Sequence, residues 1–141
     1  MLYLREETDL IIIHCSNTPP TMDIGKKELN KWYRQRGYSD SGFHFVIRRD
    51  GTIETGRNPQ SVGAHAVGHN FTSIGICLIG GVNKSDVPEN NFTPEQWDSL
   101  VKLLKGLKTK YPEAKIIGHN EVAQKSCPSF DVQKWKTTVG L

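Results

Sequence analysis

The sequence predicts an α/β domain in which a central mixed β-sheet is flanked by helices. Short apolar runs rich in β-branched residues are typical of buried strands, and three such runs occur. Segments with helical spacing separate them, and an Asp-Gly pair between two further β-rich runs predicts a hairpin. Helices packed on one central sheet suit this alternation. The predicted order β-α-β-β-β-α-β-α follows residues 8–15, 24–36, 43–56 (two strands), 73–81, 92–111, 114–119 and 131–135.

The strands are predicted from short apolar runs with clear ends. The run "TDLIIIHC" has the length and β-branched content of a buried strand, and its alternation places His14 and Cys15 on opposite faces. The run "FHFVIRRDGTIETG", residues 43–56, predicts a hairpin because Gly51 after Asp50 accepts a positive φ.

The helices are predicted from apolar spacing and from their end signals. The segment 24–36 has aromatic and apolar residues at helical spacing, and Gly37 after it is a natural stop. In the segment 92–111, Thr93 and Gln96 form the sequence pattern of a capping box. We expect its apolar face to consist of Trp97, Leu100, Val101, Leu104 and Tyr111.

Composition sets the broad class of the protein. The chain has 141 residues, of which 36% are apolar and 23% charged. This length is enough to bury a core without disulfides or metal. The formal net charge of +3 suits an anionic partner, but no dense basic tract predicts nucleic-acid binding. The cysteines are odd in number and widely spaced, so we expect no disulfide framework and a reducing compartment.

Neither a targeting signal nor a membrane span is predicted. The start, "MLYLREETD", has no long apolar core and turns acidic at once, which argues against a signal peptide. No stretch approaches the eighteen apolar residues of a membrane-spanning helix. We therefore expect the chain to stay in the cytoplasm of the producing cell unless another factor releases it.

Two histidines and a cysteine are candidate metal ligands. His14 and His119 each end an apolar strand, and strand ends at the rim of a sheet often carry functional side chains. Together with Cys127 they would supply three zinc ligands and leave a fourth position for water. Each histidine alone is more often a hydrogen-bonded core residue, so the residues leave both interpretations open. Lys125 is a candidate oxyanion stabiliser, or else a solvated surface lysine.

Five sequence blocks, in order, carry a family resemblance that spans roughly residues 9–135. The chain resembles the zinc-dependent N-acetylmuramoyl-L-alanine amidases of the amidase-2 family, which includes the peptidoglycan recognition proteins, and within it the small phage endolysins of T-seven lysozyme type. The resemblance implies a single amidase-2 domain over residues 1–141, without a separate wall-binding domain. It also implies that bound Zn²⁺ assists cleavage of the amide between N-acetylmuramic acid and L-alanine in peptidoglycan. The blocks are "IIIHCSNT", "GFHFVIRRDGTIETGR", "VGAHAVGHNFTSIGICLIGG", "NFTPEQ" and "GHNEVAQKSCPSFD".

The resemblance also implies roles for single residues. The zinc ligands of the family fall on His14, His119 and Cys127. Lys125 matches a lysine that assists catalysis in phage-type members, and His65 matches a histidine that lines the substrate groove.

One position departs from the family pattern. Phe43 stands where active phage-type members have a tyrosine, and Cys77 stands near the place where another branch has a catalytic glutamate. Three hypotheses follow: a weak amidase, an amidase that uses His44 or His65 instead, or a protein that binds peptidoglycan without cutting it. We also consider His69 as a groove residue.

The resemblance extends to partners and release. Small phage endolysins reach the cell wall through a membrane lesion made by a holin, and the T-seven type also binds its phage RNA polymerase. Peptidoglycan is therefore the expected partner, a polymerase is left open, and a monomer is the expected state.

Overall fold

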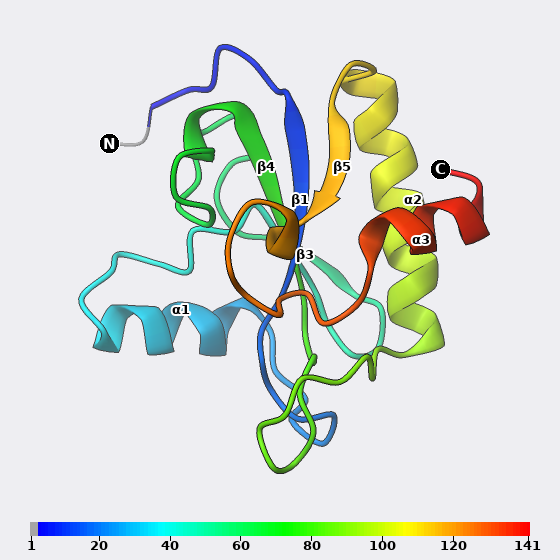
Figure 1. Ribbon diagram of the computed structural model, residues 1–141. Coiled ribbons are helices and arrows are strands. Elements are labelled where there is room, and N and C mark those ends of the chain that lie inside the picture. The colour runs from blue at the N-terminus through cyan, green and yellow to red at the C-terminus, as the bar shows by residue number, and fades with distance from the viewer. Residues whose placement is uncertain (1–2) are drawn as a thin grey trace.

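The computed structural model describes residues 3–141. Met1 and Leu2, which begin the segment predicted not to be a signal peptide, lie outside the described residues. The helices and strands follow the predicted order (Figure 1). They are β1 (Leu10–Cys15), α1 (Lys26–Gln35), β2 (Phe45–Ile47), β3 (Ile53–Thr55), β4 (Ser73–Leu78), α2 (Pro94–Lys110), β5 (Lys115–Gly118) and α3 (Val132–Val139), with 3₁₀ turns η1 (Asn70–Thr72) and η2 (His119–Glu121).

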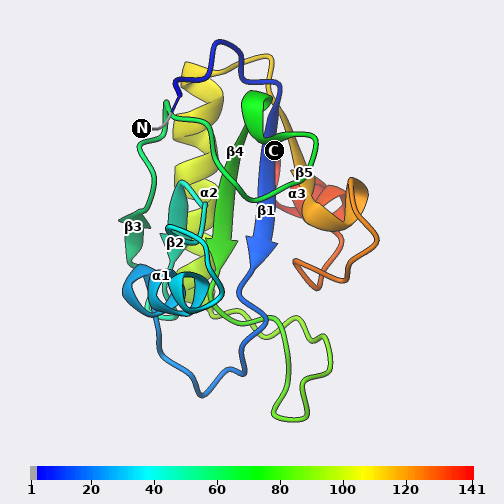
Figure 2. The ribbon, with the colours of Figure 1, turned by 90° about the vertical axis from the view of Figure 1, so that its left-hand side faces the viewer.

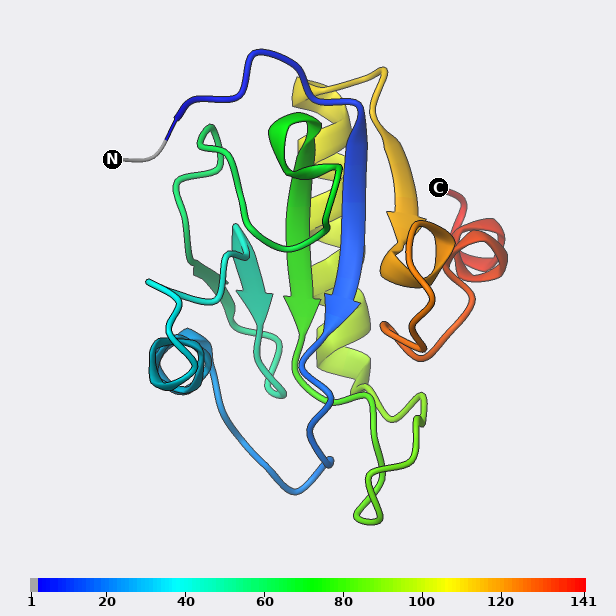
Figure 3. The same cartoon turned by 60° about the vertical axis from the view of Figure 1, so that its left-hand side comes forward.

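Five strands form one mixed sheet in the order β3-β2-β4-β1-β5. The strand β1 pairs in parallel with both β4 and β5, and β2 pairs in parallel with β4. Only β3 runs antiparallel, against β2, so the predicted hairpin is confirmed, and Gly51 in its turn has a φ of 89°. The four parallel strands therefore end at one edge of the sheet (Figure 3).

The two faces of the sheet are covered by different helices. Figure 2 shows α1 in front of the sheet and α2 behind it. On the α2 face, strand residues such as Ile13 and Ile76 form one apolar cluster with Leu104. On the α1 face, Leu29 packs in a smaller cluster with Cys77. The alternation of side chains along each strand thus separates a large core from a thinner layer.

The helix α2 begins with the predicted capping box. The hydroxyl of Thr93 accepts a hydrogen bond from the backbone N–H of Gln96 at 3.1 Å, and the Gln96 side chain accepts one from the backbone N–H of Thr93 at 2.9 Å. Its buried face differs in part from the prediction, because Leu107 is buried whereas Val101 is only half-buried. The helical period that starts at Leu100 continues through positions 104 and 107 and turns Val101 aside. None of the helices in residues 3–141 combines the length and apolar character needed to cross a membrane.

The last strand is shorter than predicted. The strand β5 ends at Gly118, whose backbone N–H donates to the carboxylate of Glu121 at 2.6 Å. This bond accompanies a turn into η2, which begins at His119. His119 is therefore carried by the turn that follows the strand.

Candidate metal centre

Two of the predicted ligands meet because their strands are neighbours. His14 is the last but one residue of β1, and His119 directly follows β5. The parallel register pairs Ile13 with Gly118, so the residues that follow them, His14 and His119, come to the same edge of the sheet. The ring centroids of the two histidines lie 4.4 Å apart. A separation of 105 residues in sequence is thus closed by one strand pairing.

The loop after η2 brings Cys127 to the same place. The backbone N–H of Cys15 donates a hydrogen bond to the Cys127 sulfur at 3.2 Å, which ties this loop to the end of β1. The donor atoms of His14, His119 and Cys127 lie within 4.8 Å of one another. Within residues 3–141, no other group of three or more His, Cys, Asp or Glu side chains is placed to hold a metal.

The surroundings of the two histidines keep both side chains in the form that can ligate a metal. Burial, then the neighbouring His65, His119 and Lys125, hold the pKa of His14 well below its ordinary value. Burial and then Lys125 lower the pKa of His119 in the same direction. Both imidazoles are therefore neutral at neutral pH, which is the form that ligates a metal.

The pKa of the Cys127 thiol shifts in the opposite direction, toward the protonated form. A hydrogen bond with the Cys15 thiol, followed by burial, raises the pKa of the Cys127 thiol above its ordinary value. A metal bound here would take the place of the thiol proton, so binding would release a proton. Two neutral imidazoles and one thiolate, with room for a fourth ligand, fit the donor set of a catalytic zinc site.

A cavity of about 500 Å³ opens over these three residues. Lys125, which is exposed, and His65 both line it. The far wall is aromatic and cationic: the guanidinium of Arg36 lies 4.5 Å from the ring centroid of Tyr33 and 5.8 Å from that of Tyr38. The cavity thus joins the candidate metal ligands to a wall suited to polar and ring-shaped groups.

Phe43 forms part of the cavity wall next to the ligands. Its ring centroid lies 5.0 Å from that of His14 and 6.4 Å from that of Tyr33, and only 6% of its surface is exposed. Cys77 pairs with His14 in the register of β4 and β1, but it is completely buried and does not line the cavity. No hydroxyl or carboxylate therefore stands at either position.

His44 does not have the place expected for it. His44 is completely buried: its Nε2 bonds the carbonyl oxygen of Ser61 at 2.7 Å, and its Nδ1 accepts from the backbone N–H of Gly75 at 3.0 Å. Burial lowers the pKa of His44 to about 4. His69 lies outside the residues that line the cavity. His44 is therefore enclosed within the protein and does not line the cavity, which contradicts a substrate contact for it. A groove role for His69 stays a prediction.

His65 makes contacts that the sequence did not indicate. Its Nδ1 lies 2.8 Å from Nε2 of His14, and its Nε2 lies 3.2 Å from the hydroxyl of Ser73. Both ring nitrogens are thus engaged within the protein. The contact of Ser73 with His65 is one that sequence reasoning missed, and the available signal was the place of Ser73 at the start of an apolar strand.

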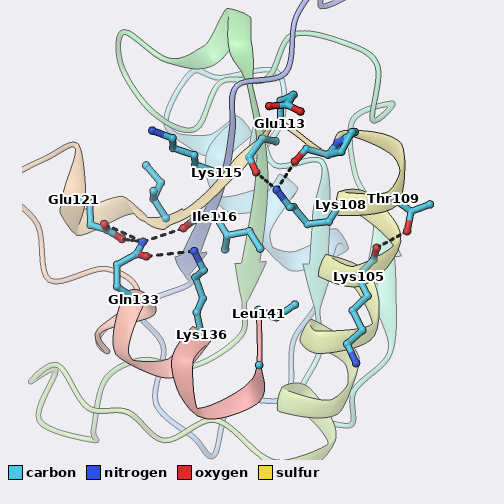
Figure 4. A pocket seen from close by; sticks show the side chains of 14 residues that line it. Lys105, Lys108, Thr109, Glu113, Lys115, Ile116, Glu121, Gln133, Lys136 and Leu141 are labelled. Carbon is cyan, nitrogen blue, oxygen red and sulfur yellow. Dashed lines mark hydrogen bonds between the residues drawn. The ribbon is translucent and has the colours of Figure 1, made fainter.

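A second cavity of about 850 Å³ lies away from these residues, between the end of α2, β5 and α3 (Figure 4). It is larger than the first but contains no histidine or cysteine. Its polar groups bond mainly to each other: the Lys108 ammonium donates to the carbonyl oxygens of Pro112 and Ala114, and the Gln133 amide donates to Glu121. Its size alone therefore does not make it the functional site.

Comparisons with known proteins show the family of the chain. The family model described as N-acetylmuramoyl-L-alanine amidase matches residues 4–130. The chain is 48% identical over 131 residues to the endolysin of Escherichia phage T7. The aligned residues cover 93% of this chain and 87% of that protein.

Two solved structures share the fold. The endolysin LysCS of Clostridium intestinale, an N-acetylmuramoyl-L-alanine amidase, has a TM-score of 0.84 and 31% identity, with 100% of this chain and 89% of that one covered. A tyrosine-to-phenylalanine mutant of Drosophila PGRP-LB in complex with tracheal cytotoxin has a TM-score of 0.73 and 29% identity, with 91% and 79% covered. The chain therefore belongs to the N-acetylmuramoyl-L-alanine amidase family.

Proposed function

We propose that this protein is a phage endolysin that cleaves the amide between N-acetylmuramic acid and L-alanine in peptidoglycan, with zinc held by His14, His119 and Cys127. One observation carries the proposal: three side chains with the donor chemistry of a catalytic zinc site converge at the floor of a cavity. They do so in a chain of the amidase family whose relative, the phage T7 protein, is an endolysin.

The residues around the cavity supply the remaining parts of an amide hydrolysis. Zinc bound to these ligands would polarise the amide carbonyl and make the attacking water more acidic. Lys125 places a cation at the cavity rim, where it can stabilise negative charge that develops on the carbonyl oxygen. The wall formed by Tyr33, Arg36 and Tyr38 offers stacking and charge for the glycopeptide.

Phe43 sets the expected rate. Its ring lies against His14, where a tyrosine would present a hydroxyl to the cavity. Of the two replacements considered from the sequence, His44 is buried and bonded at both nitrogens, and His65 is bonded to His14 and Ser73. Loss of one transition-state hydrogen bond lowers a rate by about 100- to 1,000-fold. We therefore propose a slow amidase.

The second candidate function is binding of peptidoglycan without cleavage. Phe43 favours it, and the structurally similar PGRP-LB mutant holds tracheal cytotoxin after a tyrosine-to-phenylalanine change. The complete ligand set favours cleavage, because binding alone does not require three converging metal ligands.

Incubation of the zinc-loaded protein with purified peptidoglycan distinguishes the two functions. We expect mass spectrometry to detect free stem peptides that begin with L-alanine, and we expect Phe43→Tyr to release them about 100-fold faster. Phe43→Leu is the control, because it also alters the side chain at this position but adds no hydroxyl. No stem peptide from either the natural protein or Phe43→Tyr, with both folded and zinc-loaded, would leave binding as the function.

Release and assembly remain predictions. We propose that the protein reaches the wall through a holin-type lesion, acts as a monomer and needs no separate wall-binding domain. Turbidity of chloroform-treated Gram-negative cells, which bypasses the lesion, tests whether the protein alone attacks the wall. Neither the comparisons nor the contacts of residues 3–141 support a phage RNA polymerase partner.

A further inference from the structure

The imidazole of His65 lies in a seat made by two glycines. Its ring lies over Gly75 of β4, where an added Cβ would come within 2.5 to 2.7 Å of the ring atoms. A Cβ at Gly63 would also come within 2.7 Å of its Cδ2 atom. The backbone N–H of His65 donates to the side chain of Asn70 at 2.8 Å, which fixes the loop. The ring is thus held in place before any substrate arrives.

The hydrogen bonds that connect this ring to His14 allow only one order of donors and acceptors. The hydroxyl of Ser73 lies 2.7 Å from the carbonyl oxygen of His69, which can only accept, so the hydroxyl proton is used there. The hydroxyl oxygen must then accept from Nε2–H of His65, 3.2 Å away. His65 Nδ1 is therefore an acceptor, and Nε2 of His14, 2.8 Å away, is its donor. This order leaves Nδ1 of His14 without a proton.

We propose that His65 and Ser73 are positioning residues of the metal centre, which fix the tautomer and ring orientation of His14 so that its Nδ1 faces the metal. The proposal rests on the metal centre proposed above. Metal-binding histidines commonly donate their other ring N–H to a fixed acceptor, and loss of that acceptor weakens metal binding by about 10- to 100-fold. Here the acceptor is a neutral imidazole, anchored through Ser73 to a backbone carbonyl.

A role limited to substrate contact does not explain this arrangement. Both ring nitrogens of His65 are engaged within the protein, so a substrate group would have to break one of these bonds to reach a nitrogen. Ser73 is completely buried and cannot touch substrate, yet it belongs to the same chain of bonds. The series of hydrogen bonds runs from the carbonyl oxygen of His69 through Ser73 and His65 to His14.

Zinc affinity of the full chain, measured by competition with a chromophoric chelator, tests the proposal. We expect His65→Leu to raise the zinc dissociation constant about 10- to 100-fold. His65→Asn, whose side-chain oxygen can replace Nδ1 as acceptor, should recover most of the affinity. Gly75→Ala leaves His65 intact but pushes its ring, and Ser73→Ala removes the anchor. Both should weaken binding in the same direction, so the test does not depend on one variant folding.

The cobalt-substituted protein gives a second reading. Because cobalt absorption reports ligand geometry, we expect His65→Leu and Ser73→Ala to change the visible spectrum at saturating cobalt. His69→Ala is the matched control: it removes a neighbouring imidazole but keeps the backbone carbonyl that anchors Ser73. It should change neither the zinc affinity nor the spectrum.

The outcomes separate this inference from the proposed function. If the natural protein binds no zinc, the proposed metal centre fails. If the natural protein binds zinc and folded His65→Leu and Ser73→Ala bind it equally well with the same cobalt spectrum, only the positioning role is overturned. A variant His65→Leu that raises KM for a muramyl peptide without changing zinc affinity would assign His65 to substrate contact alone.

Discussion

The two faces of the sheet are built from the same strands, yet one is a core and the other carries a candidate active site. On β1, Ile13 points into the apolar cluster under α2, while the next residue, His14, points to the cavity. On β4, Ile76 packs in the core, while Gly75 leaves space for the His65 ring. Substitutions on the core face should therefore lower the free energy of unfolding, whereas substitutions on the cavity face should change metal binding and cleavage.

The largest expected effect is on the site face, at a proposed ligand. Cys127→Ser should abolish stoichiometric zinc binding and slow cleavage by roughly 1,000-fold or more, because several kcal/mol of transition-state stabilisation is lost. Metal analysis and a stem-peptide assay measure both quantities. The matched control is Cys77→Ala, which removes a buried thiol outside the cavity and should keep the zinc. Zinc retained at full stoichiometry in Cys127→Ser would contradict the ligand assignment.

On the core face, the expected effect is on stability alone. Leu104 is completely buried under the sheet, so Leu104→Ala should lower the free energy of unfolding by about 2 to 5 kcal/mol. Val101 lies one turn away and is half-buried, so Val101→Ala should lower the free energy of unfolding by less. Urea denaturation measures both. At temperatures where Leu104→Ala is folded, its zinc affinity should equal that of the natural protein, and a large loss would show that the faces are coupled.

The smallest expected effect is on the pH dependence of the free energy of unfolding, to which a buried histidine on the site face contributes. Burial lowers the pKa of His44 to about 4, whereas an unfolded histidine titrates near 6.5. Between these values the unfolded chain binds a proton that the folded chain does not. The free energy of unfolding of the zinc-free protein should therefore fall as the pH falls from about 6.5 to about 4, by at most about 3 kcal/mol from this group. This contribution is present above pH 6.5.

His65, whose pKa burial lowers to about 3, adds to the same slope. The variant His44→Gln should flatten the pH profile without removing it. Stability that is constant from pH 6.5 to pH 4.5 would contradict the buried, neutral state of His44.

Much of the fold was predictable from local signals. The hairpin at Asp50 and Gly51 and the capping box of Thr93 and Gln96 depend on neighbouring residues, and both are confirmed. The candidate ligands were predictable as residue types, because strand ends concentrate functional side chains. That His14 and His119 meet depends on the pairing of β1 with β5, which periodicity does not specify.

The surroundings of the site were less predictable. Nothing in the residues next to His44 and His65 shows that the ring of His44 is buried whereas that of His65 lines the cavity, because the packing of distant segments decides it. The end of β5 at Gly118 depends on a bond to Glu121 that strand propensity does not reveal. One signal was available: a glycine inside an apolar strand, as at Gly75, often marks the close approach of another group.

Metal dependence of cleavage tests the central claim most directly. The natural protein is stripped with a chelator, titrated with zinc, and assayed at each point for stem peptides released from peptidoglycan. We predict that the stripped protein is inactive and that activity returns in proportion to bound zinc, reaching its maximum at one ion per chain. Stem-peptide release at full rate from protein without metal would contradict a zinc amidase centred on His14, His119 and Cys127.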